Sequence, residues 1–234
     1  MSSTNKVYSL MKHLGFKLIG INEELEEIEE LEKNKNEEEK EILNFTIMII
    51  GDSKTGKTSF CNRFALNLFD LEIKPSIETS CYCKTILLFD KEIKIYLIDM
   101  ETIQISPLTE EEEDELYKII DGIILIYDIT QNESLANAEK ILNDMKKNEN
   151  LNKNIPITIV GNKNDLGFLR DRDFDEANQK AAKLGYELKE INCNKDIEMV
   201  HNIMKNLIAK IYFNNLDNEE KEQLIKQYKD LHNQ

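Results

Sequence analysis

The sequence predicts an α/β fold whose sheet is mostly parallel and carries helices on both faces. Apolar runs that suit buried strands alternate with stretches whose apolar residues recur every three or four positions, as on one face of a helix. One such run, 42–50, leads directly into a glycine-rich turn at 51–58 and then into a helical pattern. The length of 234 residues suits one main domain with extensions at its ends.

Six strands are expected, at about 42–50, 79–89, 92–99, 122–128, 155–160 and 186–192. The helices expected between and after them lie at about 57–69, 131–147, 174–184 and 196–213. The link at Asp90-Lys91 is too short for the crossover that parallel neighbours require. The two strands that it joins should therefore form an antiparallel hairpin at one edge of the sheet.

The turn at 51–58 reads GDSKTGKT, a Gly-x-x-x-x-Gly-Lys-Thr phosphate loop. In this pattern the glycines let backbone N–H groups face phosphates, Lys57 reaches the β- and γ-phosphates, and the Thr58 hydroxyl is placed to bind Mg²⁺. An ordinary Gly- and Ser-containing turn is the alternative, but such a turn does not require a Lys-Thr pair after its second glycine. The predicted phosphate-binding residues are Gly51, Ser53, Lys54, Thr55, Gly56, Lys57, Thr58 and Ser59.

A second element, IPITIVGNKNDL at 155–166, predicts which base is bound. Its apolar strand delivers Asn162, Lys163 and Asp165 at the carboxyl end, where open parallel sheets bind ligands. The Asp165 carboxylate can accept two hydrogen bonds, from N1–H and the exocyclic amine of guanine, and adenine lacks that donor pair. Asn162 and Lys163 would brace the loop and cover the base, so the sequence predicts a guanine nucleotide.

With both elements in place, the chain resembles the small GTPases of the Ras superfamily, and the stretch 121–130, DGIILIYDIT, is most similar to the Rab branch. The resemblance covers roughly residues 44–213 and implies the G-domain fold, with GTP or GDP and Mg²⁺ as ligands. It also implies that a loop after the last strand packs over the guanine. Family members usually carry Ser-Ala-Lys there, whereas this chain has Cys193, Asn194 and Lys195.

The resemblance implies a Mg²⁺ site made by Thr58, Ser76 and Asp99. Ser76 stands in the first switch, where the family usually has threonine. A serine hydroxyl can also ligate the metal, and the alternative is that Ser76 is a turn residue after Pro75. Asp99 would hold the ion through water.

The second switch departs further from the family motif Asp-x-x-Gly-Gln, which aligns with DMETI at 99–103. Thr102 replaces the glycine whose backbone N–H approaches the γ-phosphate. Ile103 replaces the glutamine that orients the attacking water, and an alkyl side chain has no donor or acceptor for that role. We therefore assign no catalytic residue and expect GTP hydrolysis to be very slow or absent. Gln104 could compensate only if the loop slipped by one position.

Two short segments carry nearly all of the formal net charge of −15. Residues 22–41 hold eleven Glu against three Lys, and residues 110–115 are six carboxylates that follow Thr109, a suitable helix N-cap. The acidic segment 109–116 is either a solvated helix or a docking face for a protein partner with a basic surface. Without a basic stripe, nucleic acid and anionic membranes are not expected as partners.

Extensions are predicted on both sides of the G domain, at 1–43 and 214–234. The first should be an acidic amphipathic helix that packs on the domain or on a protein partner, because its apolar residues lie three or four apart: Leu18, Ile21, Leu25, Ile28 and Leu31. The second should be another amphipathic helix, after a break at Asn214-Asn215.

No lipid anchor or transmembrane segment is expected, because the chain ends in LHNQ, has Ser2 after the first methionine, and lacks a long apolar run. The four cysteines lack the spacing of a zinc site, which favours a reduced, cytoplasmic protein. Two functions fit. The first is a Rab-like pseudo-GTPase that binds guanine nucleotide as a structural part of a larger assembly, cytoskeletal or other. The second is an active regulatory GTPase in trafficking or signalling. The altered second switch and the added helices favour the first.

Overall fold

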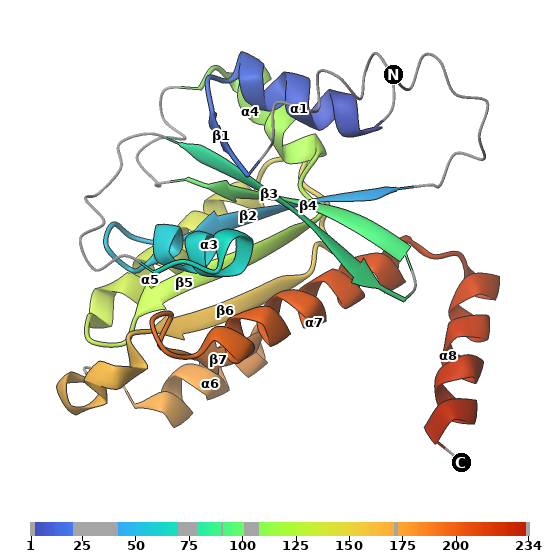
Figure 1. The fold of residues 1–234 in the computed structure, drawn as a ribbon. Coiled ribbons are helices and arrows are strands. Elements are labelled where there is room, and N and C mark those ends of the chain that lie inside the picture. The colour runs from blue at the N-terminus through green and yellow to red at the C-terminus, as the bar shows by residue number, and fades with distance from the viewer. Residues whose placement is uncertain are drawn as a thin grey trace.

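The computed structural model describes residues 3–20, 42–69, 79–89, 91–100, 108–170 and 173–232. They form one seven-stranded sheet between two layers of helices (Figure 1). The strands lie side by side in the order β1-β3-β4-β2-β5-β6-β7. Their bounds are β1 (Lys17–Ile19), β2 (Leu43–Ile50), β3 (Ser80–Leu88), β4 (Lys91–Asp99), β5 (Gly122–Asp128), β6 (Ile157–Asn162) and β7 (Glu187–Glu190).

Each face of the sheet has its own helices and its own apolar core. One face packs against α1 (Ser3–His13), α4 (Glu110–Lys118), α5 (Asn132–Met145) and α6 (Phe174–Lys183). The other packs against α3 (Lys57–Leu66) and α7 (Ile197–Asn215). From Ile47 to Ile50, successive β2 side chains alternate between the two cores, and because both faces are covered this stretch is apolar instead of alternating with polar residues.

The α/β fold predicted from the sequence is confirmed. The pairs β2–β4, β2–β5, β5–β6 and β6–β7 are all parallel. β3 and β4 form the predicted antiparallel hairpin, with Ser80 opposite Asp99 and Leu88 opposite Lys91. The observed strands begin and end close to their predicted bounds, although β6 runs on to Asn162.

The prediction of six strands is wrong, because the N-terminal segment adds a seventh. β1 pairs in parallel with β3, from Lys17 opposite Ser80 to Ile19 opposite Tyr82. The hairpin strand β3 is therefore not the edge of the sheet along this stretch. Gly20 ends the strand with a left-handed φ of 75°, and a Cβ there would lie 2.8 Å from the carbonyl oxygen of Cys83.

The N-terminal extension also differs from its predicted helical form. Leu18 lies in a strand, so the helix expected to begin there is wrong at this residue. The helix found upstream, α1, buries Val7 and Met11 in the core that it shares with α4 and α5. Three residues are too few to show a twofold alternation in the sequence, although Leu18 packs toward one core and Ile19 toward the other. The rest of the predicted acidic helix, 21–41, lies outside the described residues.

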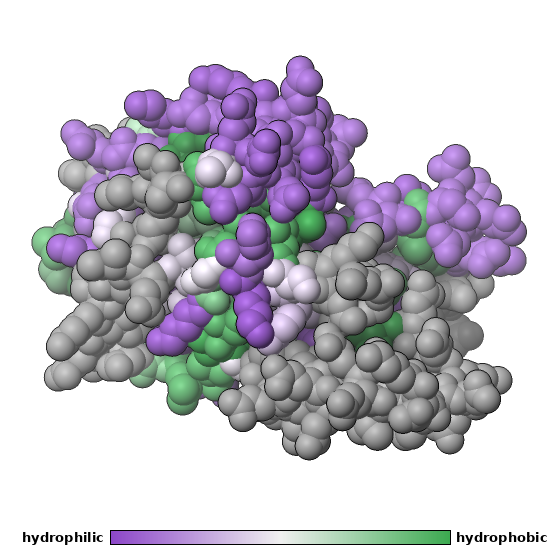
Figure 2. Space-filling model, turned by 90° about the horizontal axis from the view of Figure 1, so that it is seen from above, coloured by the Kyte–Doolittle hydropathy of each residue, from purple (hydrophilic) through white to green (hydrophobic). Residues whose placement is uncertain are grey.

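The acidic segment after Thr109 forms α4, as predicted. Thr109 caps it with a reciprocal pair of hydrogen bonds: the Thr109 side chain accepts from the Glu112 N–H at 3.2 Å, and the Thr109 N–H donates to the Glu112 carboxylate at 2.8 Å. These bonds hold the pKa of Glu112 below its ordinary value. Figure 2 shows the side of the molecule on which α1 and α4 lie, where hydrophilic residues gather at the top of the view and apolar residues show below them.

A second amphipathic helix, α8 (Asn218–His232), follows α7 after a short break. Its first turn is also capped reciprocally, by Asp217 and Glu220. α8 points away from the sheet in Figure 1. None of the described helices is long and apolar enough to cross a membrane.

Candidate nucleotide-binding site

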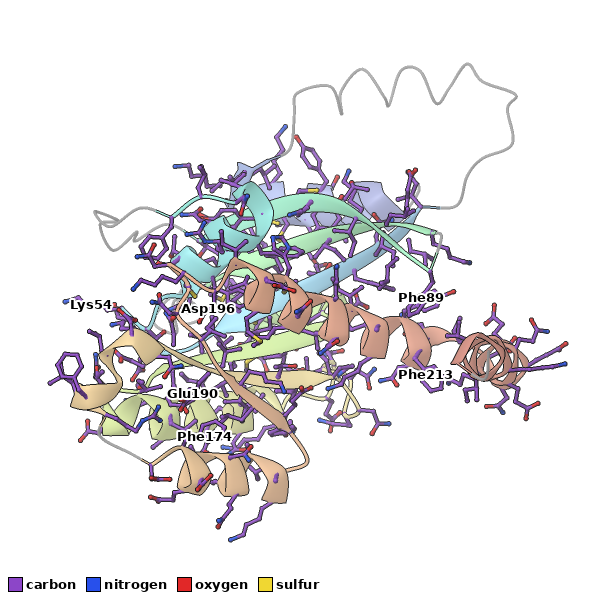
Figure 3. All side chains as sticks on the ribbon, turned by 60° about the horizontal axis from the view of Figure 1, so that its bottom comes forward. Lys54, Phe89, Phe174, Glu190, Asp196 and Phe213 are labelled. Carbon is purple, nitrogen blue, oxygen red and sulfur yellow. The ribbon has the colours of Figure 1, made fainter. Side chains whose placement is uncertain are left out.

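The predicted site residues that the structure describes meet at one edge of the sheet. The phosphate loop follows β2, Asp99 ends β4, Asn162 ends β6, and the loop at 192–196 follows β7. These strands and β5 run in the same direction, so their carboxyl ends lie at a common edge, which is where open α/β sheets bind ligands. Figure 3 shows Lys54, Glu190 and Asp196 at this end of the molecule, with Phe89 and Phe213 at the opposite end.

Two positions of the phosphate loop require glycine. A Cβ on Gly51 would collide with the carbonyl oxygen of Ile126, and a Cβ on Gly56 would collide with the side-chain nitrogen of Asn162. Gly56 also has a left-handed φ of 100° and stands at the N-cap of α3, where no side chain caps the helix. The start of α3 is thus a positive helix end without a side-chain cap, an arrangement that suits phosphate binding.

The remaining loop residues complete this cradle. The Lys57 side chain is only 4% exposed, and its ammonium group donates to the carbonyl oxygens of Gly51 at 3.0 Å and Asp52 at 2.8 Å. Buried Thr55 donates its hydroxyl to the same Asp52 carbonyl at 2.9 Å. Ser53 and Lys54 are exposed at the tip of the loop, and Ser59 is half-buried in the first turn of α3. The loop therefore closes around the lysine that the sequence assigns to the phosphates.

Thr58 and Asp99 are brought together as predicted. The Thr58 hydroxyl donates to the Asp99 carboxylate at 2.5 Å, across 41 positions of sequence. This pair offers hard oxygen ligands, which suit Mg²⁺, an ion that is usually held by one or two protein groups together with substrate phosphates. Ser76, the third predicted ligand, lies outside the described residues. Within the described part of the chain, no group of three or more His, Cys, Asp or Glu could hold a metal by itself.

Asn162 joins the phosphate loop to the loop after β7. Its side-chain amide donates to the Thr55 carbonyl oxygen at 2.9 Å, and its carbonyl oxygen accepts from the Cys193 N–H at 3.2 Å. The residue is 4% exposed, so both bonds are shielded from water. Asn162 thus braces the loops, as predicted.

Lys163 lies beside a buried carboxylate that the sequence analysis did not single out. Its ammonium group is 2.6 Å from Asp128, which also accepts from the backbone and side chain of Thr130 and from Gln131. Burial raises the pKa of Asp128, but the hydrogen bonds from Lys163 and Thr130 outweigh it and hold the pKa below its ordinary value. Asp128 therefore stays ionised and keeps Lys163 in place.

Asp165 is exposed in the short 3-10 helix Asn164–Leu169, immediately after β6. Two bonds fix this segment on the sheet. The Asn164 N–H donates to the Ile191 carbonyl oxygen at 3.0 Å. Arg170 makes a bidentate ion pair with Glu190, in which each guanidinium nitrogen lies 2.6 Å from a carboxylate oxygen. The Asp165 carboxylate is thus exposed on a turn that is hydrogen-bonded to the sheet.

Comparison with known proteins assigns the family. The profile of the Ras family matches residues 46–213. The chain belongs to the Ras family. It is 31% identical over 169 residues to a protein named Ras-related protein Rab-11A from Dictyostelium discoideum, covering 72% of this chain and 76% of that protein. It is 28% identical over 183 residues to Ras-related protein YPTC6 from Chlamydomonas reinhardtii, covering 76% and 82%.

Ras-family proteins bind guanine nucleotides, generally with Mg²⁺, and the residues of this Rab-like member fit both ligands. The fit is carried by the glycine cradle at Gly51 and Gly56 and by the paired oxygens of Thr58 and Asp99. Bound Mg²⁺ would neutralise phosphate charge, and Thr58 and Asp99 would hold it.

In this Ras-family protein the loop at 192–196, which the resemblance places over the guanine and which we call the base loop, is held by contacts that its sequence does not indicate. Cys193 is 2% exposed, and burial raises the pKa of its thiol to about 12, so the thiol is neutral and packs as an apolar group. Asn194 and Lys195 are exposed next to it. The loop carbonyls are bound by Arg63 of α3. Sequence analysis missed Arg63 and Asp128, and an Asn137–Asp52 bond of 2.7 Å between α5 and the phosphate loop.

Proposed function

We propose that this protein binds guanine nucleotide with Mg²⁺, hydrolyses GTP very slowly or not at all, and acts as a structural component of a larger intracellular assembly. The finding that supports nucleotide binding most directly is the convergence of three anchored groups at one sheet edge. These are the phosphate loop, the Thr58–Asp99 pair and the turn that carries Asp165.

Each group has a distinct task in binding. The N–H groups at the start of α3 and the ammonium group of Lys57 orient the phosphates. Thr58 and Asp99 supply the oxygens for Mg²⁺. The Asp165 carboxylate accepts hydrogen bonds from the guanine edge, and Asn162 and Lys163 keep its loop in position.

The proposal of impaired hydrolysis rests on the residue types of the second switch. Ile103 has no polar atom with which to orient a water, and Thr102 carries a branched Cβ where the family uses glycine. Both positions lie outside the described residues and are assigned by sequence alone. Without hydrolysis, bound GTP would remain chemically unchanged, and a nucleotide that binds only the folded state would stabilise the fold.

Single-turnover release of γ-phosphate tests the hydrolysis proposal. The purified protein is loaded with GTP, and phosphate is followed with and without Mg²⁺. We expect release well below the typical intrinsic rate of a small GTPase, on the order of 10⁻⁴ s⁻¹. Ile103→Gln is the matched variant, and it should raise the rate if the missing glutamine is the cause. Fast release by the unaltered protein would instead support the regulatory GTPase, with which the Thr58–Asp99 pair is equally compatible.

The proposed assembly partner has a basic surface. The first turn of α4 presents Glu110, Glu111, Glu112 and Glu113, while Leu116 and Tyr117 face the core. The acidic segment 22–41 would add a second contact of the same sign. Binding to such a partner should weaken with added salt, because exposed charges are screened within about 8 Å at physiological ionic strength. Binding unaffected by salt would contradict a charge-based contact.

A further inference from the structure

Arg63 is a buried arginine that connects two parts of the protein far apart in sequence. It lies in the last turn of α3 and is 6% exposed. Its Nε donates to the Cys193 carbonyl oxygen and its Nη2 to the Asn194 carbonyl oxygen, both at 2.9 Å. Hydrogen bonds from a charged, planar guanidinium are stronger and more directional than neutral ones. The base loop is therefore fixed to α3 by one side chain.

The same guanidinium also holds the chain that leaves α3. Its Nη1 donates to the Asn67 carbonyl at 3.3 Å, and its central carbon lies 5.5 Å from the centre of the Phe69 ring. Asn67 ends the helix in a left-handed conformation, with φ of 57°. Phe69 is the last described residue before the segment that contains Ser76. Arg63 thus connects the exit of α3 with the base loop.

Both backbone polar groups of Cys193 in the base loop are hydrogen-bonded to other elements. The Cys193 N–H donates to the Asn162 side chain, and the Cys193 carbonyl oxygen accepts from Arg63. Bonds within the loop complete it. The Asn192 N–H donates to Asp196, the Asn194 N–H donates to the Asn192 side chain, and the Asn192 carbonyl oxygen accepts from the N–H groups of Lys195 and Asp196. These internal bonds shape the loop but do not fix where it lies relative to the phosphate loop. Backbone bonds from Ile191 to Gly161 and Asn164 fix the start of the loop, and Asn162 and Arg63 place the part at Cys193 and Asn194.

We propose that Arg63 is a positioning residue for the base loop, and that it couples retention of the nucleotide base to the conformation of the chain after α3. The inference rests on the proposed binding of guanine nucleotide. When Asn67 and Phe69 are in place, Arg63 keeps Cys193 and Asn194 over the base site. If Asn67 and Phe69 moved away, Arg63 would lose its contacts with them and would hold the base loop less firmly. The nucleotide would then dissociate faster, although binding of its phosphates would be unchanged.

The test compares the full chain with Arg63→Gln, Arg63→Lys and a matched control, Lys84→Met. Lys84 is a suitable control because it also binds α3 through a backbone carbonyl, that of Phe64 at 2.6 Å, and it is not a contact of the base loop. Dissociation of a fluorescent GDP analogue is followed after mixing with excess GDP. Arg63→Gln should release it about 10- to 100-fold faster, since charged hydrogen bonds are lost. Arg63→Lys should be intermediate, and Lys84→Met should stay within about 2-fold.

Two further measurements separate positioning from general damage. Inorganic tripolyphosphate probes the phosphate loop alone, and its affinity should be the same in Arg63→Gln as in the unaltered protein. Amide hydrogen exchange of nucleotide-free protein should show faster exchange at 192–196 in Arg63→Gln, with the strands unchanged.

The outcomes distinguish this inference from the proposed function. Unchanged GDP release and unchanged exchange at 192–196 would overturn the positioning role. Weaker tripolyphosphate binding together with faster exchange throughout the sheet would also overturn it, because Arg63 would then support the whole fold. If the unaltered protein binds no GDP, the proposed function fails, whereas loosening confined to 192–196 in Arg63→Gln would still show that Arg63 positions the loop.

Discussion

The phosphate loop and the base loop differ in what holds them. The phosphate loop is shaped largely by its own residues: two obligatory glycines, and a lysine and a threonine that bind carbonyls within the loop. The base loop is placed by side chains from other elements, Asn162 from β6 and Arg63 from α3. The phosphate loop therefore depends mainly on its own residues, with outside contacts from Asn162 and Asn137, whereas the base loop depends mainly on tertiary packing.

This difference has a functional consequence. We expect a loop shaped mainly by its own glycines to stay formed whenever α3 and β2 are folded. Phosphate binding should therefore tolerate substitutions in distant elements. A loop held by long-range hydrogen bonds responds to movements of the elements that provide them. If the protein binds guanine nucleotide as proposed, we expect nucleotide release to respond mainly to changes at the base end of the site.

The largest effect is expected from Gly56→Ala in the phosphate loop. The added Cβ would displace the Asn162 amide and would demand a left-handed backbone from alanine. We expect a loss of about 2–4 kcal/mol in the free energy of unfolding and nucleotide affinity too weak to titrate. Gly167→Ala is the control, because nothing lies within 4 Å of a Cβ there. Chemical denaturation measures the free energy of unfolding, and nucleotide titration measures the affinity. Normal nucleotide binding by Gly56→Ala would show that the phosphate loop does not require glycine at this position.

A smaller effect, confined to the base end, is expected from Asp165→Asn. The amide presents a donor where guanine also has one, so GDP affinity should fall by about 100-fold. Xanthosine diphosphate, which has an acceptor at that position, should bind better than it does to the unaltered protein. Calorimetric titration of both nucleotides measures the switch. An unaltered preference for GDP would mean that another group recognises the base.

The smallest effect is expected from Lys54→Gly. Lys54 has a left-handed φ of 63° in the phosphate loop, a conformation that glycine adopts without strain. Relief of that strain, partly offset by the greater freedom of glycine in the unfolded chain, should raise the free energy of unfolding by about 0.5–1 kcal/mol. Ser53→Gly, at the neighbouring position with no left-handed φ, should instead be slightly destabilising. Equal effects of the two substitutions in thermal melts would argue against local strain.

Much of the fold was predictable because its signals are local. The buried strands are apolar runs, the capped start of α4 follows Thr109, and the phosphate loop is a contiguous motif. Thr58 and Asp99 were paired through the family resemblance, and the structure places them in contact.

The features that sequence analysis missed depend on long-range contacts. β1 has only three residues, and it is a strand because β3 offers it an edge. Arg63 looks like any arginine of an amphipathic helix until the fold brings Cys193 beside it, 130 positions away. Asp128 ends an apolar strand, and nothing in the sequence around it indicates that Lys163 binds it.

The most direct test of the account is the affinity of the purified protein for GDP and for ADP, titrated with Mg²⁺ present. We predict tight GDP binding and a preference over ADP of at least about 100-fold, since the Asp165 carboxylate finds its donor pair only on guanine. Equal affinities, or no binding of either nucleotide, would contradict the central claim that this sheet edge is a guanine-nucleotide site.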